Sequence, residues 1–394
     1  MTNAKKTVVV GVTGGIAVYK ALDVISKLKK KDFEVHVIMT ESATRFVTPL
    51  SFQSLSQNIV NSDMFSEPKA WEIQHISLAK RADLIAVIPA TANIIGKVAN
   101  GIADDLLSTT IMATKAPVVF APAMNTNMYN NPIVRDNINK LQNLGYKFIN
   151  PASGRLACGD EGEGKLADTE LISEYIQSMM YDKKDLQGKK VLVTAGPTIA
   201  QIDPVRYITN RSSGKMGYAI AEEARDRGAE VTLICGATSL AAPFGIEVVS
   251  SRTNEEMLKE VLDRFNEQDI VIKAAAVADY KPKQYSDRKI KKAEEELNLT
   301  FIKDNDILKK LGTLKNNQIL VGFAAESNDL LENAQKKLHN KNLDYIVAND
   351  ITAVDTGFAS DNNKVTIICR DGKTIHLDKM SKRQVASRLF DLMK

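Results

Sequence analysis

The sequence predicts an α/β protein with two domains in tandem, each built on a mainly parallel sheet. Strand-like apolar runs alternate with helix-like segments from the start: TVVVGV at 7–12, a segment with apolar residues at helical spacing, then EVHVIMT. A charged stretch with few apolar residues, YDKKDLQGKK at 181–190, interrupts this pattern, and KVLVTAGPT restarts it. We therefore expect two Rossmann-like domains, over residues 1–182 and 190–394, joined by a linker at 183–189.

Each domain contains further apolar runs that predict buried strands. These runs are DLIAVIPA and PVVFAPAMN in the first domain, and EVTLICG, DIVIKAAAVADY, ILVGFAAE and LDYIVAND in the second. Their ends carry small or turn-forming residues, as expected where parallel strands deliver loops to one edge of a sheet. Near the C-terminus, VTIICRDGKTIHL consists of two alternating runs joined by Asp371 and Gly372. This pattern predicts an antiparallel hairpin added to the second sheet.

The composition is that of an ordinary globular protein. The 394 residues are 44% hydrophobic and 25% charged, and 52 Lys and Arg against 48 Asp and Glu leave a net charge of +4. That balance argues against nucleic acid as the main partner. Because no apolar run reaches the roughly 18 residues of a membrane helix, and the start leads directly into a strand, we expect a cytoplasmic protein without a membrane partner.

The three cysteines differ in their surroundings. An odd number without CxxC spacing argues against a disulfide framework or a zinc site. Cys235 and Cys369 end apolar strand-like runs, so we expect them in the core. Cys158 instead stands in GRLACGDEGEGKLAD at 154–168, a glycine-rich run that holds neither a steady helix nor a buried strand.

The first domain carries candidate ligand loops at its predicted strand ends. The turn GVTGGIA at 11–17 joins a strand to a helix, where free N–H groups favour a phosphate, although many such turns only make a tight connection. It is not GxGxxG, so it does not indicate a nicotinamide dinucleotide. In MTESATRF, hydroxyls and an aromatic ring suit a mononucleotide, but the same residues also suit a helix N-cap. His75 begins a helix-like segment before a strand, which fits either a structural or a catalytic histidine.

Together, GGIA, HIS, PAMN at 122–125 and ACGDEGEG around Cys158 resemble the flavin-dependent cysteine decarboxylases. The resemblance is greatest to the N-terminal half of the bifunctional phosphopantothenoylcysteine decarboxylase/phosphopantothenate-cysteine ligases of coenzyme A biosynthesis. It implies a catalytic histidine at His75, a substrate carboxylate held by Asn125, a flap that carries Cys158, and active sites at subunit contacts in a trimer. It also implies that FMN binds to Gly14, Gly15, Ile16, Thr40, Ser42, Phe46, Ala92 and Ser108.

The chemistry of that family gives Cys158 a role. Loss of CO₂ from a cysteine carboxylate leaves a carbanion that needs an electron sink, and cofactors supply such chemistry. In the reaction that the resemblance implies, FMN oxidises the thiol carbon to a thioaldehyde, decarboxylation gives an enethiolate, and this is then reduced and protonated. A thiol with an ordinary pKa of about 8.5 can donate that proton at neutral pH, while the glycines around Cys158 let a flap close.

The second domain combines a small-residue turn with a basic loop. RYITNRSSGKMGYAIAEEA places Ser212, Ser213 and Gly214 at a helix start, but without the spacing of an ATPase P-loop. AAAVADYKPKQYSDRKIKK joins a strand end and Asp279 to a lysine-rich loop. The loop alone is typical of a solvated basic flap. Beside a carboxylate that can hold Mg²⁺, it also suits a triphosphate site.

These motifs resemble the ligase half of the same bifunctional enzymes, over residues 190 to about 365. The resemblance implies that CTP, as co-substrate, activates 4′-phosphopantothenate as an acyl-cytidylate, from which cysteine displaces CMP. It assigns the acyl-cytidylate to Arg206 and Asn210, the first half-reaction to Lys289, and Mg²⁺ to Asp279. The implied CTP site comprises Ala274, Ala275, Asp279, Lys289, Asn305, Asp306, Ile307, Phe323, Lys337 and Lys341. Asn305 stands where the family usually has proline, which puts only the local geometry in question.

We therefore expect an enzyme with both activities, which acts on small molecules and forms a homo-oligomer. Trimeric decarboxylase domains and dimeric ligase domains would together build a dodecamer. A two-domain NAD(P)-dependent dehydrogenase is the first alternative, and the missing GxGxxG argues against it. A non-catalytic flavin-binding regulatory protein is the second, but such a protein needs neither Cys158 nor a complete ligase half.

Overall fold

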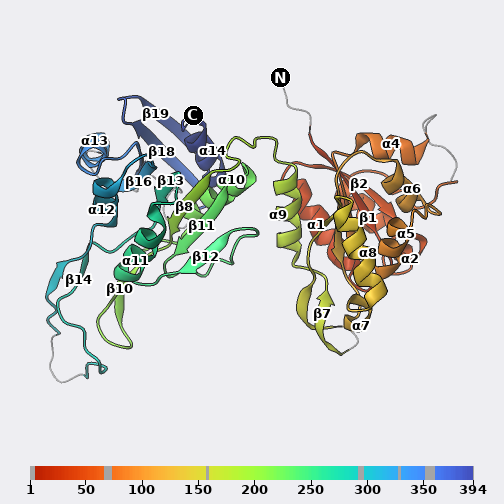
Figure 1. Cartoon of the computed structure of the whole chain (residues 1–394), viewed down its shortest axis with the longest axis horizontal. Coiled ribbons are helices and arrows are strands. Elements are labelled where there is room, and N and C mark those ends of the chain that lie inside the picture. Colours follow the sequence, from red (N-terminus) through yellow and green to blue (C-terminus); the bar gives the residue numbers. More distant parts are fainter. Residues whose placement is uncertain are drawn as a thin grey trace. The chain divides into compact units, whose positions relative to one another are not determined.

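The computed structural model describes residues 5–65, 73–156, 159–291, 297–326, 330–350 and 360–393. The chain divides into two compact units, Met1–Met180 and Tyr181–Lys394, called here the first and the second unit. In Figure 1 they are coloured from red to yellow and from green to blue. Each unit is a layered α/β structure around a mainly parallel sheet, so the predicted fold class is confirmed.

The first unit contains a five-stranded parallel sheet in the order β2-β1-β3-β4-β5. β1 and β3 are continuous apolar runs because helices cover both faces of a parallel sheet. The strands are β1 (Thr7–Val12), β2 (Glu34–Met39), β3 (Leu84–Ala90), β4 (Val118–Pro122) and β5 (Lys147–Phe148).

Helices pack on both faces of this sheet. One core contains side chains of α1 (Val18–Lys30), α3 (Pro49–Ser56) and α9 (Thr169–Met179). The other core contains side chains of the helices α4 (Gln74–Arg81), α5 (Ala92–Ala99), α6 (Leu106–Ala113) and α8 (Pro132–Asn143). In α1 the helical spacing buries Val18, Ala21, Val24, Ile25 and Leu28, so the predicted βαβ unit is present.

The glycine-rich run forms an antiparallel ribbon of β6 (Ala152–Arg155) and β7 (Glu161–Lys165). Gly164 has a φ of +132°, and a Cβ at this position would collide with the carbonyl oxygen of Met124. Glycine therefore lets the ribbon lie directly against the loop between β4 and the short helix α7 (Thr126–Tyr129). Ala157 and Cys158, which stand between β6 and β7 in the sequence, lie outside the described residues.

The second unit contains an eight-stranded sheet in the order β12-β11-β8-β13-β16-β17-β18-β19. The six strands from β12 to β17 are parallel, and β18 and β19 add the antiparallel hairpin that the sequence predicts. The strands are β8 (Lys190–Ala195), β11 (Glu230–Cys235), β12 (Glu247–Ser250), β13 (Ile270–Lys273), β16 (Ile319–Glu326), β17 (Tyr345–Asp350), β18 (Asn362–Cys369) and β19 (Thr374–Ser381).

Two helix layers cover the second sheet. α10 (Lys215–Asp226) and α14 (Lys382–Asp391) contribute to the core on one face. α11 (Asn254–Phe265), α12 (Ile307–Leu314) and α13 (Leu330–Asn340) contribute to the core on the other. Two small ribbons, β9 (Ile199–Gln201) with β10 (Tyr207–Thr209) and β14 (Tyr280–Pro282) with β15 (Phe301–Lys303), extend from the strand ends (Figure 1). Cys235 and Cys369 are buried free thiols, as expected.

The segment 183–189, predicted as a linker, packs on the second unit and belongs to it. Leu186 is buried in the core on the α10 and α14 face. The Asp185 carboxylate lies 3.1 Å from the guanidinium of Arg227, which is fully buried and also pairs with Glu223 at 2.8 Å. These two contacts hold the segment against the second unit, although most of its residues are polar or charged. Among the described helices, none is long and apolar enough to cross a membrane.

Candidate functional sites

In the first unit, the loops after β1 and β3 are bonded together at the carboxyl edge of the sheet. The hydroxyl of Thr13 donates to the carbonyl oxygen of Pro89 at 2.7 Å, and the N–H of Thr91 donates to the Thr13 hydroxyl oxygen at 3.2 Å. Gly15 lies beside the methyl group of Thr91. In open α/β sheets, ligands bind at such a place, where the connections that follow two neighbouring strands leave the sheet on opposite sides.

The end of β2 closes the same edge. Thr40 is the N-cap of α2 (Glu41–Thr44) and accepts from the N–H of Ala43, so its side chain has the capping role that was one of the two expectations for it. Ser42 packs on Gly14, where a Cβ would collide with the serine. The close approach of the two loops explains why the turn after β1 has glycine at position 14.

A cavity of about 650 Å³ opens beside the β1–α1 turn. The end of β4 and the β6–β7 ribbon form its other walls. Gly14, Gly15 and Ile16 line it, as does Asn125. The complete lining is Gly14, Gly15, Ile16, Ala17, Tyr19, Lys20, Thr91, Ala123, Met124, Asn125, Met128, Arg155, Leu156, Gly164, Lys165 and Leu166.

The remaining residues expected to bind FMN, and His75, do not line this cavity. Ser108 is fully buried in a capping box with Asp105 at the start of α6, so it serves that helix. Phe46 is 52% exposed, and His75 is half-buried in the first turn of α4. Ala92 begins α5, directly after the cavity residue Thr91. Their roles toward a flavin stay predictions.

Asn125 connects β4 to the ribbon. Its amide nitrogen donates to the carboxylate of Asp160 at 2.8 Å, and its amide oxygen accepts from the N–H of Asn127 at 2.8 Å. The N–H of Met124 donates to the carbonyl oxygen of Gly164 at 2.9 Å. These bonds hold the β6–β7 ribbon beside the cavity, and the expected contact of Asn125 with a substrate carboxylate stays a prediction. The expected acid, Cys158, lies outside the described residues.

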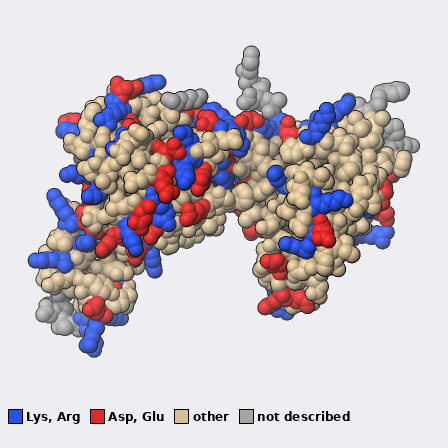
Figure 2. Space-filling model, viewed as in Figure 1, with Lys and Arg blue, Asp and Glu red and all other residues tan. Residues whose placement is uncertain are grey.

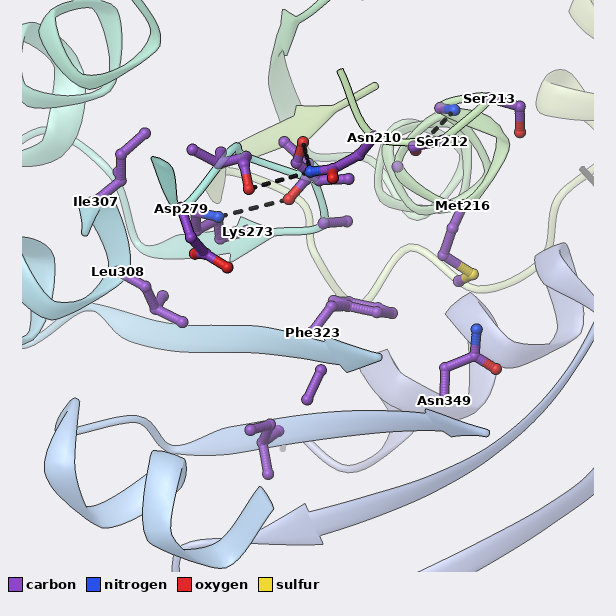
Figure 3. A pocket seen from close by; sticks show the side chains of 18 of the residues that line it. Asn210, Ser212, Ser213, Met216, Lys273, Asp279, Ile307, Leu308, Phe323 and Asn349 are labelled. Atoms are coloured by element: carbon purple, nitrogen blue, oxygen red, sulfur yellow. Dashed lines mark hydrogen bonds between the residues drawn. The ribbon is translucent and has the colours of Figure 1, made fainter. Parts of the chain in front are cut away.

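The second unit has a cavity of about 540 Å³ at the carboxyl edge of its sheet (Figure 3). The ends of β13, β16 and β17 and the first turns of α10 and α12 surround it. Most residues expected in the ligase site line this cavity: Asn210, Ala274, Ala275, Asp279, Asn305, Asp306, Ile307, Phe323, Lys337 and Lys341. The structure thus brings together residues that are distant in the sequence.

The loop after β13 is held by side chains from other segments. The hydroxyl oxygen of Thr194 accepts from the N–H of Ala275 at 3.2 Å. The amide nitrogen of Asn210 donates to the carbonyl oxygens of Ala276 and Val277 at 3.0 and 3.2 Å. Figure 3 shows this side chain crossing to the loop. Asn210 therefore holds the loop after β13 in place as well as lining the cavity.

Charges of both signs line the α12 and α13 side of this cavity. The ammonium of Lys341 lies 2.8 Å from the carboxylate of Asp306. Burial opposes ionisation of Asp306, but the hydrogen bond from Lys341 holds the pKa of this carboxyl below its ordinary value. Asp279 lines the same cavity.

Lys273 is a cavity residue that the sequence analysis did not single out. It ends β13, and its ammonium donates to the carbonyl oxygen of Ala275 at 3.4 Å. Burial, followed by repulsion from Lys341, lowers its pKa to about 8, whereas Asp306 and Asp279 act in the opposite direction. The sequence signal that could have identified Lys273 is a charged residue at the end of an otherwise apolar strand.

Arg206 and Lys289 do not line this cavity. The guanidinium of Arg206 donates to the carbonyl oxygen of Ile290 at 3.2 Å, so the two expected residues lie on segments that are bonded to each other. Lys289 is exposed. The two positions are consistent with a basic flap beside the cavity rather than with a wall of it.

Comparisons with known proteins cover both units. Residues 1–181 match the family model described as Flavoprotein, and residues 186–394 match the DNA/pantothenate metabolism flavoprotein C-terminal domain. The coenzyme A biosynthesis bifunctional protein CoaBC of Bacillus subtilis (strain 168) is 50% identical over 388 residues, which cover 98% of this chain and 96% of that protein. The chain belongs to this bifunctional family.

Other relatives agree. CoaBC of Escherichia coli (strain K12) is 41% identical over 379 residues, covering 95% of this chain and 93% of that protein. A crystal structure of the C-terminal domain of a CoaBC is 43% identical with a TM-score of 0.46, covering 52% of this chain and 94% of that one. The two expected activities, phosphopantothenoylcysteine decarboxylase in the first unit and phosphopantothenate-cysteine ligase in the second, are confirmed by this membership. The dehydrogenase and regulatory alternatives are thereby set aside.

Proposed function

We propose that the second unit uses CTP to join 4′-phosphopantothenate to cysteine, and that the first unit uses FMN to decarboxylate the product to 4′-phosphopantetheine. One observation carries the ligase assignment. The loop after β13, the start of α12 and two lysines of the α13 region meet in one cavity that contains Asp279, Asp306, Lys337 and Lys341. A nucleoside triphosphate needs cations that stabilise the charge on its phosphates and a carboxylate that holds the accompanying Mg²⁺.

The ligase reaction consists of two displacements. A carboxylate oxygen of phosphopantothenate attacks the α-phosphorus of CTP, and the bond to the β-phosphate breaks to release pyrophosphate. The cysteine nitrogen then attacks the acyl carbon, and the carbon–oxygen bond to CMP breaks. Between the ammonium and amide states this nitrogen loses two protons to solvent. Lys289 is proposed to stabilise charge in the first displacement, and Arg206 and Asn210 to hold the acyl-cytidylate.

Two features of the cavity would bind the phosphate groups of CTP. The first turn of α10, with Ser212, Ser213 and Gly214 at its start, presents main-chain N–H groups and the positive end of the helix dipole. Mg²⁺ is proposed to bind Asp279 together with substrate phosphates, because Mg²⁺ usually takes only one or two protein carboxylates in such sites.

The cavity of the first unit fits a flavin mononucleotide. Gly14, which packs on Ser42 of α2, and Gly15 contribute only main chain to one wall, Ile16 lies beside them, and a volume of about 650 Å³ accommodates a planar ring system. When bound, FMN supplies reversible uptake of an electron pair from the substrate. Asn125 is proposed to hold the substrate carboxylate, with the ribbon excluding water and Cys158 returning a proton.

The first unit is proposed to assemble as a trimer, and the second to pair into dimers, which together would give a dodecamer. The surface of the first unit supports association: Leu50, Ile133 and Leu144 are 68%, 71% and 66% exposed. In Figure 2 broad areas of this unit carry no charged side chain, whereas charges of both signs are interspersed over the second unit. Contiguous exposed apolar patches are typical of subunit contacts.

The proposal is tested on the purified protein. Bound FMN gives a visible absorption spectrum, and its release by denaturation identifies the flavin. Continuous pyrophosphate release is expected only when CTP, 4′-phosphopantothenate and cysteine are all present. Turnover with ATP in place of CTP, or a colourless protein that still decarboxylates, would contradict the proposal.

A further inference from the structure

Asn254 does not line the ligase cavity but joins two segments that do. It is the first residue of α11 and is only 2% exposed. Its amide nitrogen donates to the carbonyl oxygen of Ala278 at 3.3 Å and to that of Asn305 at 2.9 Å. These two residues directly precede Asp279 and Asp306, whose carboxylates both belong to the cavity. One buried side chain thus bridges the loop after β13 and the start of α12.

The two hydrogen bonds determine which way the Asn254 amide faces. Both neighbours are carbonyl oxygens, which only accept, so the amide nitrogen must be the atom that faces them. The amide oxygen is then buried without a hydrogen-bond partner among the described residues. Because burial of an unpaired oxygen is unfavourable, an apolar side chain of similar shape would suit packing alone better than asparagine does. What such a side chain would lack is the pair of donated bonds.

The start of α11 is a fixed point from which this amide can act. The hydroxyl oxygen of Thr253 accepts from the N–H of Glu256 at 3.2 Å, and the Glu256 carboxylate accepts from the N–H of Thr253 at 3.1 Å, which completes a capping box. The apolar face of the helix is buried in the core, through Met257, Val261 and Phe265. The Asn254 nitrogen therefore has a set position relative to the sheet.

A main-chain bond also links the same two segments, but it does not orient them by itself. The N–H of Asp304 donates to the carbonyl oxygen of Asp279 at 2.9 Å. A single bond lets the segments rotate about it, whereas a second attachment through Asn254 fixes their relative orientation. Next to this double attachment lie the Asp279 side chain and the ion pair of Asp306 with Lys341, whose charged atoms are 2.8 Å apart.

We propose that Asn254 is a positioning residue for CTP: its amide bridge sets the place of Asp279 relative to the Asp306–Lys341 pair. Asn254 is not a cavity residue, so it acts through the main chain of the segments that carry these side chains. Misplacement by about 1 Å can cost about 100-fold in rate, so a bridge outside the cavity affects the reaction inside it. The inference rests on the proposed use of this cavity by CTP.

Asn254→Ala removes both bonds of the bridge. Titration calorimetry with CTP and Mg²⁺ should show a Kd raised about tenfold, since two hydrogen bonds that hold the site are lost. The first turnover of pyrophosphate from CTP and 4′-phosphopantothenate, measured without cysteine, should slow by up to about 100-fold. Decarboxylation of added phosphopantothenoylcysteine should stay at the wild-type rate. An unchanged Kd together with an unchanged first turnover would overturn the inference.

Asn254→Leu separates the hydrogen bonds from packing. Leucine branches at the same carbon as asparagine and fills the site, but it has no donor. The affinity of this variant for CTP should therefore be as low as that of Asn254→Ala. Wild-type affinity in Asn254→Leu would mean that the side chain only fills space, and would contradict the bridge. This variant also decides the question if circular dichroism shows that Asn254→Ala does not fold.

Thr253→Ala is the matched control. It removes the capping box at the start of the same helix without removing the bridge. The melting temperature should fall by about 2–4 °C, while the Kd for CTP should stay at the wild-type value. An equal loss of CTP affinity in Thr253→Ala and Asn254→Ala would mean that any disturbance of α11 has this effect, and would exclude a specific role of Asn254.

Failure of the inference can be told apart from failure of the proposed function. Wild-type protein that releases no pyrophosphate with CTP, 4′-phosphopantothenate and cysteine would refute the proposed ligase function. Normal release by the wild-type protein, combined with wild-type CTP affinity and first turnover in Asn254→Ala, would refute only the positioning role.

Discussion

The guanidinium of Arg206 donates a hydrogen bond at 3.2 Å to the main-chain carbonyl of Ile290, the residue that follows Lys289. The N–H of Ile290 donates at 3.2 Å to the carboxylate of Asp203, so both backbone groups of Ile290 are held. The carboxylate of Asp203 also accepts from the N–H groups of Val205 and Arg206 at 2.8 Å. The basic loop is thus anchored beside the position of Lys289, although the Lys289 side chain is exposed.

Lys289→Gln is expected to abolish acyl-cytidylate formation, because a neutral amide cannot stabilise charge that develops on the triphosphate. Decarboxylation of added phosphopantothenoylcysteine should stay at the wild-type rate. The two activities are measured separately, as pyrophosphate release and as CO₂ release. Lys283→Gln, an exposed lysine on the same loop, serves as the control and should retain ligation. Equal loss of both activities in Lys289→Gln would contradict two separable sites.

Cys158→Ser is expected to leave FMN bound while stopping decarboxylation after the oxidative step. A serine hydroxyl is a much weaker acid than a thiol, so the final protonation should fail. Stopped-flow absorbance should then show the flavin becoming reduced by phosphopantothenoylcysteine and staying reduced. Full turnover by this variant would remove Cys158 from its proposed role.

Gly164→Ala is expected to displace the ribbon from the cavity, because the added methyl group would collide with the carbonyl of Met124. Misplacement of a closing segment by about 1 Å can cost about 100-fold in rate, so kcat/KM for decarboxylation should fall by about that factor. Gly154→Ala is the matched control: its φ is +144°, also unfavourable for alanine, but nothing lies within 4 Å of the new methyl group. Similar losses in the two variants would indicate backbone strain rather than the contact with Met124.

The affinity for CTP is expected to fall as pH rises from 7 to 9. Lys273 has a pKa lowered from 10.5 to about 8, so it is mostly charged at pH 7 and mostly neutral at pH 9. Loss of this charge beside an anionic nucleotide should weaken binding by about tenfold. Titration calorimetry at the two pH values measures the change. Lys273→Arg stays protonated and should show a flatter dependence; an equally steep one would exclude Lys273 as the titrating group.

Prediction of the strands succeeded where the signal is local. TVVVGV corresponds to β1 at Thr7–Val12, and ILVGFAAE corresponds to β16 at Ile319–Glu326. A strand buried between two helix layers must be apolar at consecutive positions, and this requirement is visible in a single segment. The Asp371-Gly372 hairpin was predictable for a similar reason, since Gly372 has a φ of +90°.

The glycine-rich run had no such signal. Its ribbon has a single apolar residue, Ala152, and is positioned by contacts with Met124 and Asn125 instead of by a core of its own. Lys273 was overlooked for a related reason, because its apolar strand indicated only burial. LDYIVAND predicted only a buried strand and no partner for Asn349, because other residues of its cavity come from α10, β18 and α14.

The sequence by itself determined two α/β units, their strand order along the chain and, through motifs, both activities. Only the tertiary structure decided which side chains share a cavity and which take part in capping a helix, as Ser108 does. Adjacency in a parallel sheet depends on the order of strands across the sheet, whereas sequence patterns report only the burial of each strand. Asn349 and Lys382 thus line the same cavity although they belong to β17 and α14, which is a relationship that no local pattern reports.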